Sequence, residues 1–519
     1  MQRFEHSLRR TGQGRGRYNH GGRGRTGRGR RDRPYHGGRG RTGWGRRDRP
    51  YDHGGKRGDQ MKPLLDMIIS DLHPHTIVEE PGFLRFFESI SQSPPTSPAM
   101  LSELQSLISQ MKRIVQERLE REDNVALSSE VWNTTTNKTY MTTTCHLIDD
   151  TWTRQAYVLE TKSLPEEYKA SHVVGQLRKI ADTWRLGNKI KVVVTNVDGM
   201  KKDIKKAGWD LIPCFANTLD VVFKETLEAS SDWKEVVQRC YEISEYFSHA
   251  EAQGQLKRAQ IKMGFKQHNL VESKGDQWLS TLNMLVRISE QHQAVREVLL
   301  EFKCDLLLSE HELKNIMKTT SCLEAFKHVT SPAERYYSLS NIIPQVESIK
   351  KKLLDLQRGG NEFAKELAQH LNHHFSKAKE NDWLTLSATL DPRHRDIALS
   401  EKGASARIQK TIIAEMKHLA EERSFIQPDS LHKDLRRYLE KKRLPIDWDP
   451  LAFWNFQKGE DWNLSEVARK YLAVVLTAGP ADIAFDTEKA RLVASRRSNL
   501  DPEHLNMMLF LNGNRFLLS

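Results

Sequence analysis

Asn196 is the residue whose place in the sequence most directly raises the question of chemistry. It follows residues 190–195 (IKVVVT), a β-branched run that ends in polar residues and Gly199. Such a run predicts a strand buried on both faces of a mostly parallel sheet. Ligands and catalytic groups gather at the carboxyl ends of these strands. We therefore expect residue 196 to lie where an enzyme places a working group, and here that group is a neutral amide.

The cysteines and histidines do not form a metal-binding pattern. The cysteines are scattered through the chain: Cys145, Cys214, Cys240, Cys304 and Cys322. None belongs to a Cys-x-x-Cys pair, so we predict buried free thiols in a reducing compartment. His370 and His374 are four residues apart with His373 between them, but no cysteine or carboxylate pattern accompanies them. Surface histidines are therefore favoured over a metal site, and no cofactor is predicted.

The first 60 residues are rich in arginine and glycine. They hold 17 Arg and one Lys against one Glu and four Asp, whereas the other 459 residues hold 62 basic and 63 acidic side chains. Residues 20–35 (HGGRGRTGRGRRDRPY) and 36–51 (HGGRGRTGWGRRDRPY) form a tandem repeat. Because this composition offers little apolar surface to bury, it predicts a disordered tail that carries the chain's whole basic excess.

The tail has the composition of a nucleic-acid-binding segment. Guanidinium groups bind phosphates and aromatic rings stack on bases, so we predict sequence-tolerant binding of RNA or single-stranded DNA. The predicted contact residues are Arg23, Arg25, Arg28, Arg30, Arg31, Arg33, Arg39, Arg41, Arg46, Arg47, Tyr35, Trp44 and Tyr51. The alternative is a solvated tail without a dedicated ligand.

The remainder of the chain combines helices with one cluster of strands. Apolar residues at three- and four-residue steps predict helices in 62–123, with a Ser/Pro loop at 92–98. The sheet region is predicted in this order: strands over 125–132, 139–148 and 156–160, a helix over 166–184, a strand over 189–195, a helix from about 199, and a segment over 211–227 that begins extended and continues helical. Later helices are predicted over 233–247, 278–302, 339–356 and 363–375. No apolar run is long enough to span a membrane and the N-terminus lacks a secretory h-region, so we expect no membrane partner.

The order β-β-β-α-β-α-β/α matches the ribonuclease H-like fold. The expected fold class is thus α/β plus all-α. In this fold, acids on the first strand and on the strand after the first helix share a divalent metal pair, which activates water and stabilises a leaving phosphate oxygen. Those two positions fall at Glu130 and Asn196.

Several stretches resemble the hAT superfamily of transposases, and most of all its domesticated zinc finger BED domain-containing members. The similar stretches are residues 64–87, SSEVWNTTTNKTYMTTTCHLID (128–149), VVVTNVDGM (192–200), CFANTLDVV (214–222), DQWLSTLNMLVRISEQ (276–291), CLEAFKHVT (322–330), LSATLDPRHR (386–395), LSEVARKYLAVVLTAGPADIAFD (464–486) and RRSNLDPEHLNMMLFLNGN (496–514). The resemblance implies a ribonuclease H-like core interrupted by a large helical insertion.

The resemblance also implies a division into five parts. These are a disordered tail (1–60), a helical subdomain (61–124), the first part of the core (125–230), the helical insertion (231–445) and a C-terminal dimerisation segment that completes the core (446–519). The residues expected to form the dimer contact are Leu464, Val467, Ala468, Tyr471, Leu472, Met508, Leu509 and Phe510. A homodimer is the expected assembly.

The catalytic positions of the family are altered in this sequence. By resemblance, its three acids fall at Glu130, Asn196 and Asp482: an aspartate has become a glutamate, a second has become an amide, and a glutamate has become an aspartate. A longer side chain displaces a metal ligand, and an amide contributes no charge to hold a divalent ion. Trp278, from the family's tryptophan motif, is retained. No cysteine precedes residue 145, so the paired ligands of a BED finger are absent from that stretch.

Three functions follow as hypotheses. The leading one is a nuclear, non-catalytic, transposase-derived protein that dimerises and binds nucleic acid or chromatin in transcriptional regulation. The second is an active, Mg- or Mn-dependent transposase or nuclease that uses Glu130, Asp198 and Asp482. The third is an RNA-binding protein that acts through the Arg/Gly tail, with the folded part as a dimerising scaffold.

Overall fold

The computed structural model describes residues 54–518 apart from 91, 274–276, 330–337, 400–403, 423–427, 461, 480–494 and 499. The chain from Arg57 onward forms one compact unit. The tail residues predicted to be disordered and to bind nucleic acid lie before residue 54 and thus outside the described residues. The first helix, α2 (Gly54–Asp71), begins six residues before the predicted end of the tail. Lys56, Arg57 and Gln60 are good helix formers, which the glycine-rich composition of this stretch conceals.

Helices precede the sheet, as the apolar spacing predicts. They are α2, η1 (His75–Glu79), α3 (Pro81–Ser89) and α4 (Ser97–Glu120). The helix α4 begins where the Ser/Pro loop ends, because the Thr96 hydroxyl caps it by accepting a hydrogen bond from the Ala99 amide at 3.4 Å. Met100, Leu104, Met111 and Val115 form its buried face.

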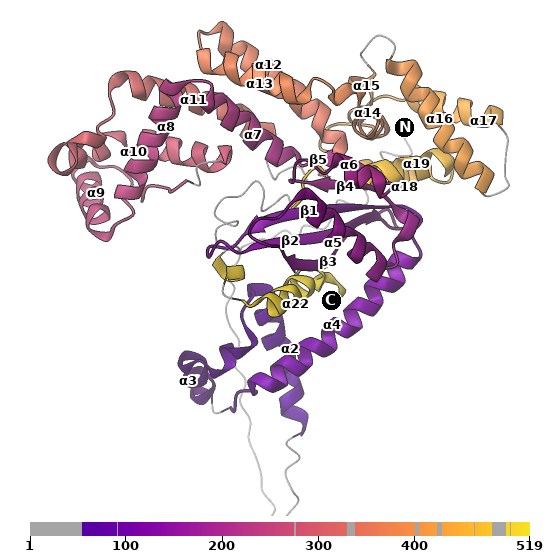
Figure 1. Ribbon diagram of the computed structural model, residues 1–519, viewed down its shortest axis with the longest axis horizontal. Coiled ribbons are helices and arrows are strands. Elements are labelled where there is room, and N and C mark those ends of the chain that lie inside the picture. Colours follow the sequence, from indigo (N-terminus) through magenta and orange to yellow (C-terminus); the bar gives the residue numbers. More distant parts are fainter. Residues whose placement is uncertain are drawn as a thin grey trace, which may run out of the picture. The chain divides into compact units, whose positions relative to one another are not determined.

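The sheet has five strands in the order β3-β2-β1-β4-β5 (Figure 1). The strands are β1 (Val125–Asn133), β2 (Thr139–Ile148), β3 (Arg154–Ser163), β4 (Ile190–Thr195) and β5 (Asp210–Pro213). The first three form an antiparallel meander, and β4 and β5 are parallel to β1. The helices between and after the parallel strands are α5 (Ala170–Thr183), η2 (Gly187–Lys189), α6 (Lys201–Lys206) and α7 (Phe215–Glu228). This is the predicted order of elements.

One face of the sheet belongs to a single large hydrophobic core. Leu127, Cys145 and Val193 on adjacent strands share this core with residues of α4, α5 and the C-terminal helix α22 (Pro502–Gly513). The helix α22 packs on the edge strand β3 and is fixed there by polar contacts: the Asn506 side chain accepts a hydrogen bond from the Thr161 amide at 2.8 Å. The last described segment of the chain therefore completes the core of the sheet.

A run of helices separates α7 from the C-terminal segment. Its members are α8 (Ser231–Tyr246), α9 (Ala250–Met263), α10 (Trp278–Phe302), η3 (Cys304–Leu306), α11 (Glu310–Val329), η4 (Leu339–Asn341), α12 (Ile342–Arg358), α13 (Glu362–Phe375), η5 (Ala378–Glu380), α14 (Asp382–Leu390), α15 (Arg395–Ala398), α16 (Ala404–Glu422) and α17 (Pro428–Glu440). The C-terminal segment then contains α18 (Pro450–Gln457), α19 (Trp462–Leu472), α22 and η6 (Arg515–Leu517). In the sequence, the helices α8 to α17 thus lie between the sheet with its first covering helices and the C-terminal helices that also pack on the sheet. None of the helices in the described ranges is long and apolar enough to cross a membrane.

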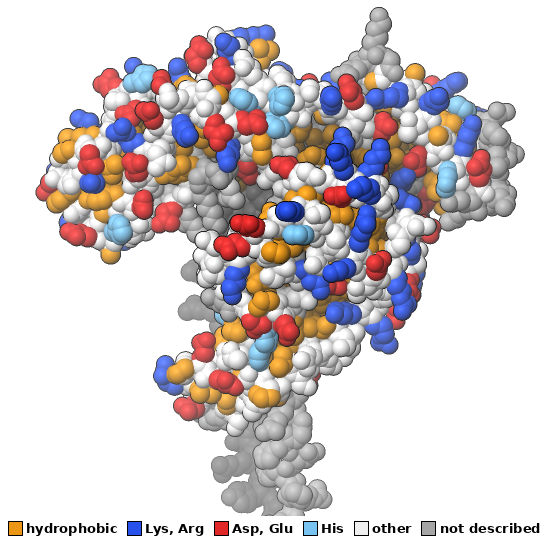
Figure 2. All heavy atoms as spheres, in the orientation of Figure 1, with side chains coloured by type: hydrophobic (Ala, Val, Ile, Leu, Met, Phe, Trp, Pro, Cys, Tyr) orange, Lys and Arg blue, Asp and Glu red, His pale blue; other side chains and the backbone are white. Residues whose placement is uncertain are grey.

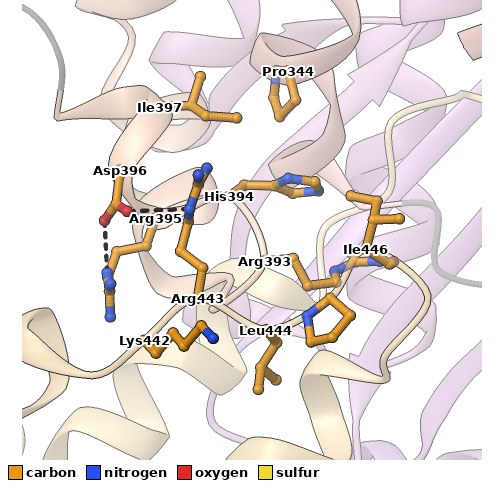
Figure 3. Close-up of a pocket in the computed structure, with 11 residues that line it drawn as sticks. Pro344, Arg393, His394, Arg395, Asp396, Ile397, Lys442, Arg443, Leu444 and Ile446 are labelled. Atoms are coloured by element: carbon orange, nitrogen blue, oxygen red, sulfur yellow. Dashed lines mark hydrogen bonds and ion pairs between the residues drawn. The ribbon is translucent and has the colours of Figure 1, made fainter.

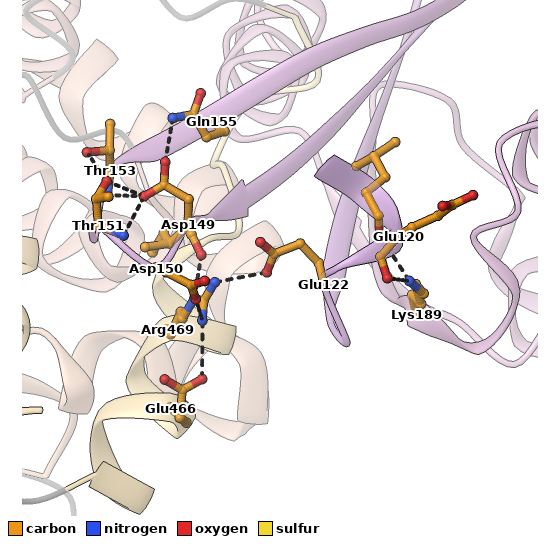
Figure 4. Close-up of polar contacts among 12 residues, drawn as sticks. Glu120, Glu122, Asp149, Asp150, Thr151, Thr153, Gln155, Lys189, Glu466 and Arg469 are labelled. Atoms are coloured by element: carbon orange, nitrogen blue, oxygen red, sulfur yellow. Dashed lines mark hydrogen bonds and ion pairs between the residues drawn. The ribbon is translucent and has the colours of Figure 1, made fainter. Parts of the chain in front are cut away.

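An ion-pair cluster around Arg469 joins α19 to the sheet (Figure 4). The guanidinium of Arg469 lies 2.9 Å from Glu122 Oε2, 3.0 Å from Asp150 Oδ1 and 3.5 Å from Glu466 Oε2. In the neighbouring turn, Asp149 Oδ1 accepts hydrogen bonds at 3.0 Å from the amides of Thr151 and Thr153. The turn between β2 and β3 is thereby fixed, and α19 is held against it.

Candidate functional site

The strand β4 ends beside Ser129 of the parallel strand β1, which continues to Asn133, and this is the edge where the fold is expected to place catalytic groups. Ser129 of β1 pairs with Thr195, the last residue of β4, so Glu130 and Asn196 are the next positions on the two strands. The Asn196 side chain forms two hydrogen bonds to the backbone of Val131: its Oδ1 accepts from the amide at 2.9 Å, and its Nδ2 donates to the carbonyl at 2.8 Å. This amide continues the backbone ladder beyond the end of β4. Its oxygen is directed at β1 and not at a ligand.

The Glu130 carboxyl group is packed against the chain that returns from α19. A Cβ atom at position 479 would fall on the Glu130 carboxylate, so the carboxylate lies directly over the Cα of Gly479. Burial raises the pKa of Glu130, and the nearby guanidinium of Arg497 lowers it in part. Burial also lowers the pKa of Arg497, which the Glu130 charge offsets. The acid and the guanidinium therefore form an electrostatic pair at the end of β1.

Trp132 and Cys214 complete the surroundings of this pair. The Arg497 guanidinium carbon lies 4.6 Å from the centre of the Trp132 ring, a cation–π distance. The Trp132 ring stacks on Tyr140 at 5.2 Å and donates from Nε1 to the Thr142 hydroxyl at 3.0 Å. Burial raises the pKa of Cys214 to about 11, so its thiol stays protonated near neutral pH. Cys214 Sγ accepts a hydrogen bond from the Ala478 amide at 3.3 Å, as a structural thiol does.

The described residues at this edge do not fit a divalent metal ion. Glu130 is the one acid of the two positions and its pKa is raised by burial, while Asn196 is a neutral amide whose oxygen accepts a hydrogen bond from Val131. A divalent ion needs several oxygen ligands that converge on one point. Across the described part of the chain, no three His, Cys, Asp or Glu side chains form such a group.

The remaining residues that the sequence analysis singled out for catalysis do not join Glu130 and Asn196 among the described residues. Asp482 lies outside the described residues. Asp198 is exposed in the turn after β4. Trp278 is buried at the start of α10, where its amide donates to Asp220 Oδ1 at 2.9 Å and its ring meets Phe326 edge-on at 5.4 Å. It acts as a core residue that joins α7, α10 and α11.

The residues expected to form the dimer contact are buried within the chain itself. All eight have at most 6% of their surface exposed: Leu464, Val467, Ala468, Tyr471, Leu472, Met508, Leu509 and Phe510. The first five lie on α19, which packs on β2 and α14, and the last three lie on α22, which packs on β3 and α4. In this arrangement their apolar surface is covered by the chain itself. Their part in a dimer contact stays a prediction.

The histidines of α13 bind a carboxylate. His370 Nδ1 and His374 Nε2 lie 3.2 and 2.8 Å from Glu225 Oε2, on α7. Burial acts to raise the pKa of Glu225, but these hydrogen bonds outweigh it and the pKa is lowered. The pair spaced four residues apart thus fastens α13 to α7, a partly buried contact that the expectation of surface histidines missed.

Sequence reasoning did not single out Gly479 or Arg497, which shape the site most directly. Arg497 is separated from Glu130 by more than 360 residues, and no local pattern links them. The position of Gly479 after an apolar run was the available signal, because glycine marks close backbone approach. This glycine indicates a close contact, but the sequence does not show that Glu130 is the residue it contacts.

Three family models match the chain. The ZBED1 RNase-like domain matches residues 128–207, the ZBED1 RNase-like helical domain matches 212–322, and the hAT family C-terminal dimerisation region matches 434–514. The first covers most of the sheet, and the second covers α7 to α10 and part of α11. Together with the mixed five-stranded sheet, these matches indicate an RNase-like domain with a helical domain, followed by a hAT dimerisation region.

These matches fit a hAT-derived, domesticated protein, and the chain is similar to zinc finger BED domain-containing proteins. It is 22% identical over 508 residues to human zinc finger BED domain-containing protein 4, an alignment that covers 87% of this chain and 43% of the relative. It is 22% identical over 362 residues to mouse zinc finger BED domain-containing protein 6, covering 64% of this chain and 36% of that relative. The chain therefore spans less than half the length of these relatives.

Proposed function

We propose that this chain is a non-catalytic, transposase-derived nuclear protein that binds nucleic acid and dimerises. The observation that carries the proposal is the environment of the two side chains at the expected catalytic positions, Asn196 and Glu130. The position of one family acid holds an amide whose oxygen and nitrogen are both bonded to Val131. The other acid, Glu130, lies under Gly479 and beside Arg497. Metal-assisted strand cleavage needs several carboxylates to hold two ions, and these two positions supply a single carboxylate, buried beside a guanidinium, and an amide that carries no charge.

A basic surface of the folded part supports a nucleic-acid partner. The helix α6 presents Lys201, Lys202, Lys205 and Lys206, all exposed, and α5 adds exposed Arg178 and Lys179 beside it. Figure 2 shows Lys and Arg side chains gathered over this part of the molecule. Because residues 61–519 are nearly neutral in sum, this surface is a local concentration of charge and not a reflection of overall composition. Phosphate groups are the partner that such a surface attracts, together with the Arg/Gly tail.

The match to the hAT dimerisation region supports a homodimer, and a chromatin partner implies a nuclear location. Regulation of transcription is the role that fits a protein that binds nucleic acid without cutting it. Fractionation of cells that express the full chain tests the location. Recovery in the cytosol alone contradicts the nuclear part of the proposal.

A strand-cleavage assay tests the non-catalytic part. Supercoiled plasmid is incubated with the full chain and Mg²⁺ or Mn²⁺, in parallel with Glu130→Ala and with an exposed control, Glu503→Ala. We expect no nicking above background in any sample. Nicking by the wild type that Glu130→Ala removes and Glu503→Ala keeps would establish the alternative, a metal-dependent nuclease.

The salt dependence of binding tests the nucleic-acid part. Removing one lysine–phosphate interaction reduces the steepness of log K against log[salt] by about 0.9 for duplex DNA and about 0.7 for single strands. We expect Lys201→Gln with Lys202→Gln to reduce the duplex slope by up to about 1.8. The control pair Lys350→Gln with Lys351→Gln, on α12, leaves it unchanged. Absence of measurable binding by the wild type at low salt removes nucleic acid from the proposal.

The tail favours a second candidate, an RNA-binding protein. Its tandem repeat places an aromatic residue within a dense run of arginines, a combination suited to stacking on unpaired bases. Binding of single-stranded RNA and duplex DNA by the full chain, compared at equal salt, distinguishes the two. A preference for RNA of tenfold or more that the α6 variants do not alter would favour this candidate.

A further inference from the structure

A basic pocket lies away from the strand ends, around the turn that joins α14 to α15. It encloses about 750 Å³ and is lined by residues of this turn, the start of α12 and the segment after α17 (Figure 3). The apolar lining residues are Pro344, Ile397, Leu444, Pro445 and Ile446, with Pro344 and Ile397 on the side opposite to Leu444 (Figure 3). The remaining lining residues are Arg393, His394, Arg395, Asp396, Lys442 and Arg443. A concave apolar wall with a few convergent polar groups is typical of a small-molecule site.

The turn itself is rigid. The Asp391 carboxylate accepts hydrogen bonds from Arg393 Nε at 3.0 Å and Nη2 at 2.8 Å, and both side chains are almost fully buried. Ser340 donates a further hydrogen bond to Asp391 at 2.7 Å. Arg393 Nη1 reaches the Ile446 carbonyl at 3.3 Å, which ties the opposite wall to the turn. This ion pair therefore positions the pocket and contributes no net charge to it.

Arg443 provides a guanidinium that one ion pair orients through its Nε atom and whose terminal amino groups can still bind a ligand. Its Nε lies 3.2 Å from Asp396 Oδ2, while Asp396 Oδ1 accepts from Arg395 Nε at 2.9 Å. The terminal amino groups of Arg443 extend toward the pocket, on the side of His394 (Figure 3). Half of the Arg443 side chain is exposed, and Lys442 lies next to it. One carboxylate thus binds two arginines, and the terminal donors of Arg443 remain for an anion.

His394 lies at the inner end of the pocket. It is only 3% exposed, and its Nε2 has no hydrogen-bond partner among the described residues. Burial lowers the pKa of His394 to about 4, so the ring is neutral near pH 7. A buried polar atom without a partner costs free energy that a bound ligand can recover.

We propose that this pocket binds a phosphorylated ligand of nucleotide size. The phosphate lies on the Arg443 fork, the flat base packs on Pro344 and Ile446, and His394 Nε2 bonds a polar edge of the ligand. A divalent cation is excluded as the primary ligand because the one carboxylate that lines the pocket, Asp396, is already held by two arginines. The proposal does not depend on the function proposed above, because the pocket shares no residue with the strand ends or with α6.

Calorimetric titration of the full chain tests the pocket with three probes: inorganic phosphate, AMP and the 5′-phosphorylated dinucleotide pTpT. We expect Arg443→Gln to raise the dissociation constant of AMP or pTpT about tenfold, because it removes one charge-assisted hydrogen-bonding group. Arg443→Lys keeps the positive charge but lacks the planar guanidinium, so its dissociation constant is expected to lie between those of the wild type and Arg443→Gln. Arg436→Gln, an exposed arginine of α17, makes the same change of charge outside the pocket and is expected to alter the constant less than twofold.

The outcomes separate the sources of the ligand. Tighter binding of AMP than of pTpT identifies a free nucleotide, and the reverse identifies a nucleotide within a strand. Because every variant retains the Arg/Gly tail, binding by the tail cancels in the comparison with Arg436→Gln. Thermal melting confirms that the variants fold. Equal affinities of folded Arg443→Gln and Arg436→Gln for all three probes, or no binding by the wild type, overturn the proposal.

Discussion

The substitution Asn196→Asp introduces the acid that the resemblance implies for this position, and we expect it to destabilise the sheet where β4 ends. A carboxylate accepts the hydrogen bond from the Val131 amide as well as the amide side chain does. It has no donor for the Val131 carbonyl, which now lies 2.8 Å from Nδ2. One carboxylate oxygen would take the place of that nitrogen and face the carbonyl oxygen directly.

The expected magnitude follows from the two bonds. Loss of one hydrogen bond costs about 1 kcal/mol, and a partly buried carbonyl left without a donor costs about 1–3 kcal/mol more. The total is about 2–4 kcal/mol at pH 7. A protonated carboxyl group can donate to the Val131 carbonyl, so the fold favours the neutral form and raises the pKa of the introduced acid. The destabilisation is therefore largest above that pKa and decreases as the pH falls through it.

Hydrogen exchange of the Val131 amide reports this change locally, which suits a large chain that does not unfold in one step. The stated energy corresponds to exchange about 30 to 1,000 times faster at pH 7, because each 1.36 kcal/mol is a factor of ten. Asn188→Asp, at an exposed position before β4, makes the same change of charge and is expected to leave the exchange rate unaltered. Unchanged protection of Val131 in Asn196→Asp at pH 7 would refute the role assigned to the amide.

Two further predictions concern neighbouring features. Burial raises the pKa of Glu122 to about 7, so the folded chain keeps a proton that the unfolded chain loses near pH 4.5. Stability should therefore decrease as the pH rises between these values. Glu122→Gln should flatten this part of the melting-temperature profile, and a profile parallel to that of the wild type would contradict the assignment. Gly479→Ala places a methyl group on the Glu130 carboxylate and should lower the stability of the fold by about 1–3 kcal/mol, as measured by thermal melting. The control Gly459→Ala has open space around the new methyl group and should leave the stability unchanged. Equal melting temperatures for the two variants would contradict the close packing.

Local patterns predicted the regular elements well, because each element depends on its own periodicity. Residues 139–148 and 278–302 have the predicted bounds. The strand β3 extends beyond its apolar centre to Arg154 and Ser163, because pairing with β2 outweighs the polar character of its ends. The helix α5 begins at Ala170 and not at 166, where the His172 ring accepts a hydrogen bond from the Lys169 amide at 3.2 Å.

The site was only half predictable from the sequence. Glu130 and Asn196 fall at adjacent strand ends because the order of elements fixes which strands are neighbours. The guanidinium and the glycine that enclose Glu130 come from a segment that returns after the helical insertion, and no spacing rule reaches that far. The dimer contact predicted for residues of α19 and α22 rests on the family resemblance, and amphipathic periodicity alone reports that a face is covered but not by which chain.

The position of α22 on β3 has a consequence for synthesis. The strand ends at Ser163 and its covering helix ends at Gly513, about 350 residues later. At roughly 5–20 residues per second, a ribosome needs roughly 20–70 s to make the intervening chain. Throughout that interval α4 and α5 can cover their part of the sheet, but the apolar residues that pack against α22 stay exposed, and the unfinished protein offers chaperones a long-lived hydrophobic target.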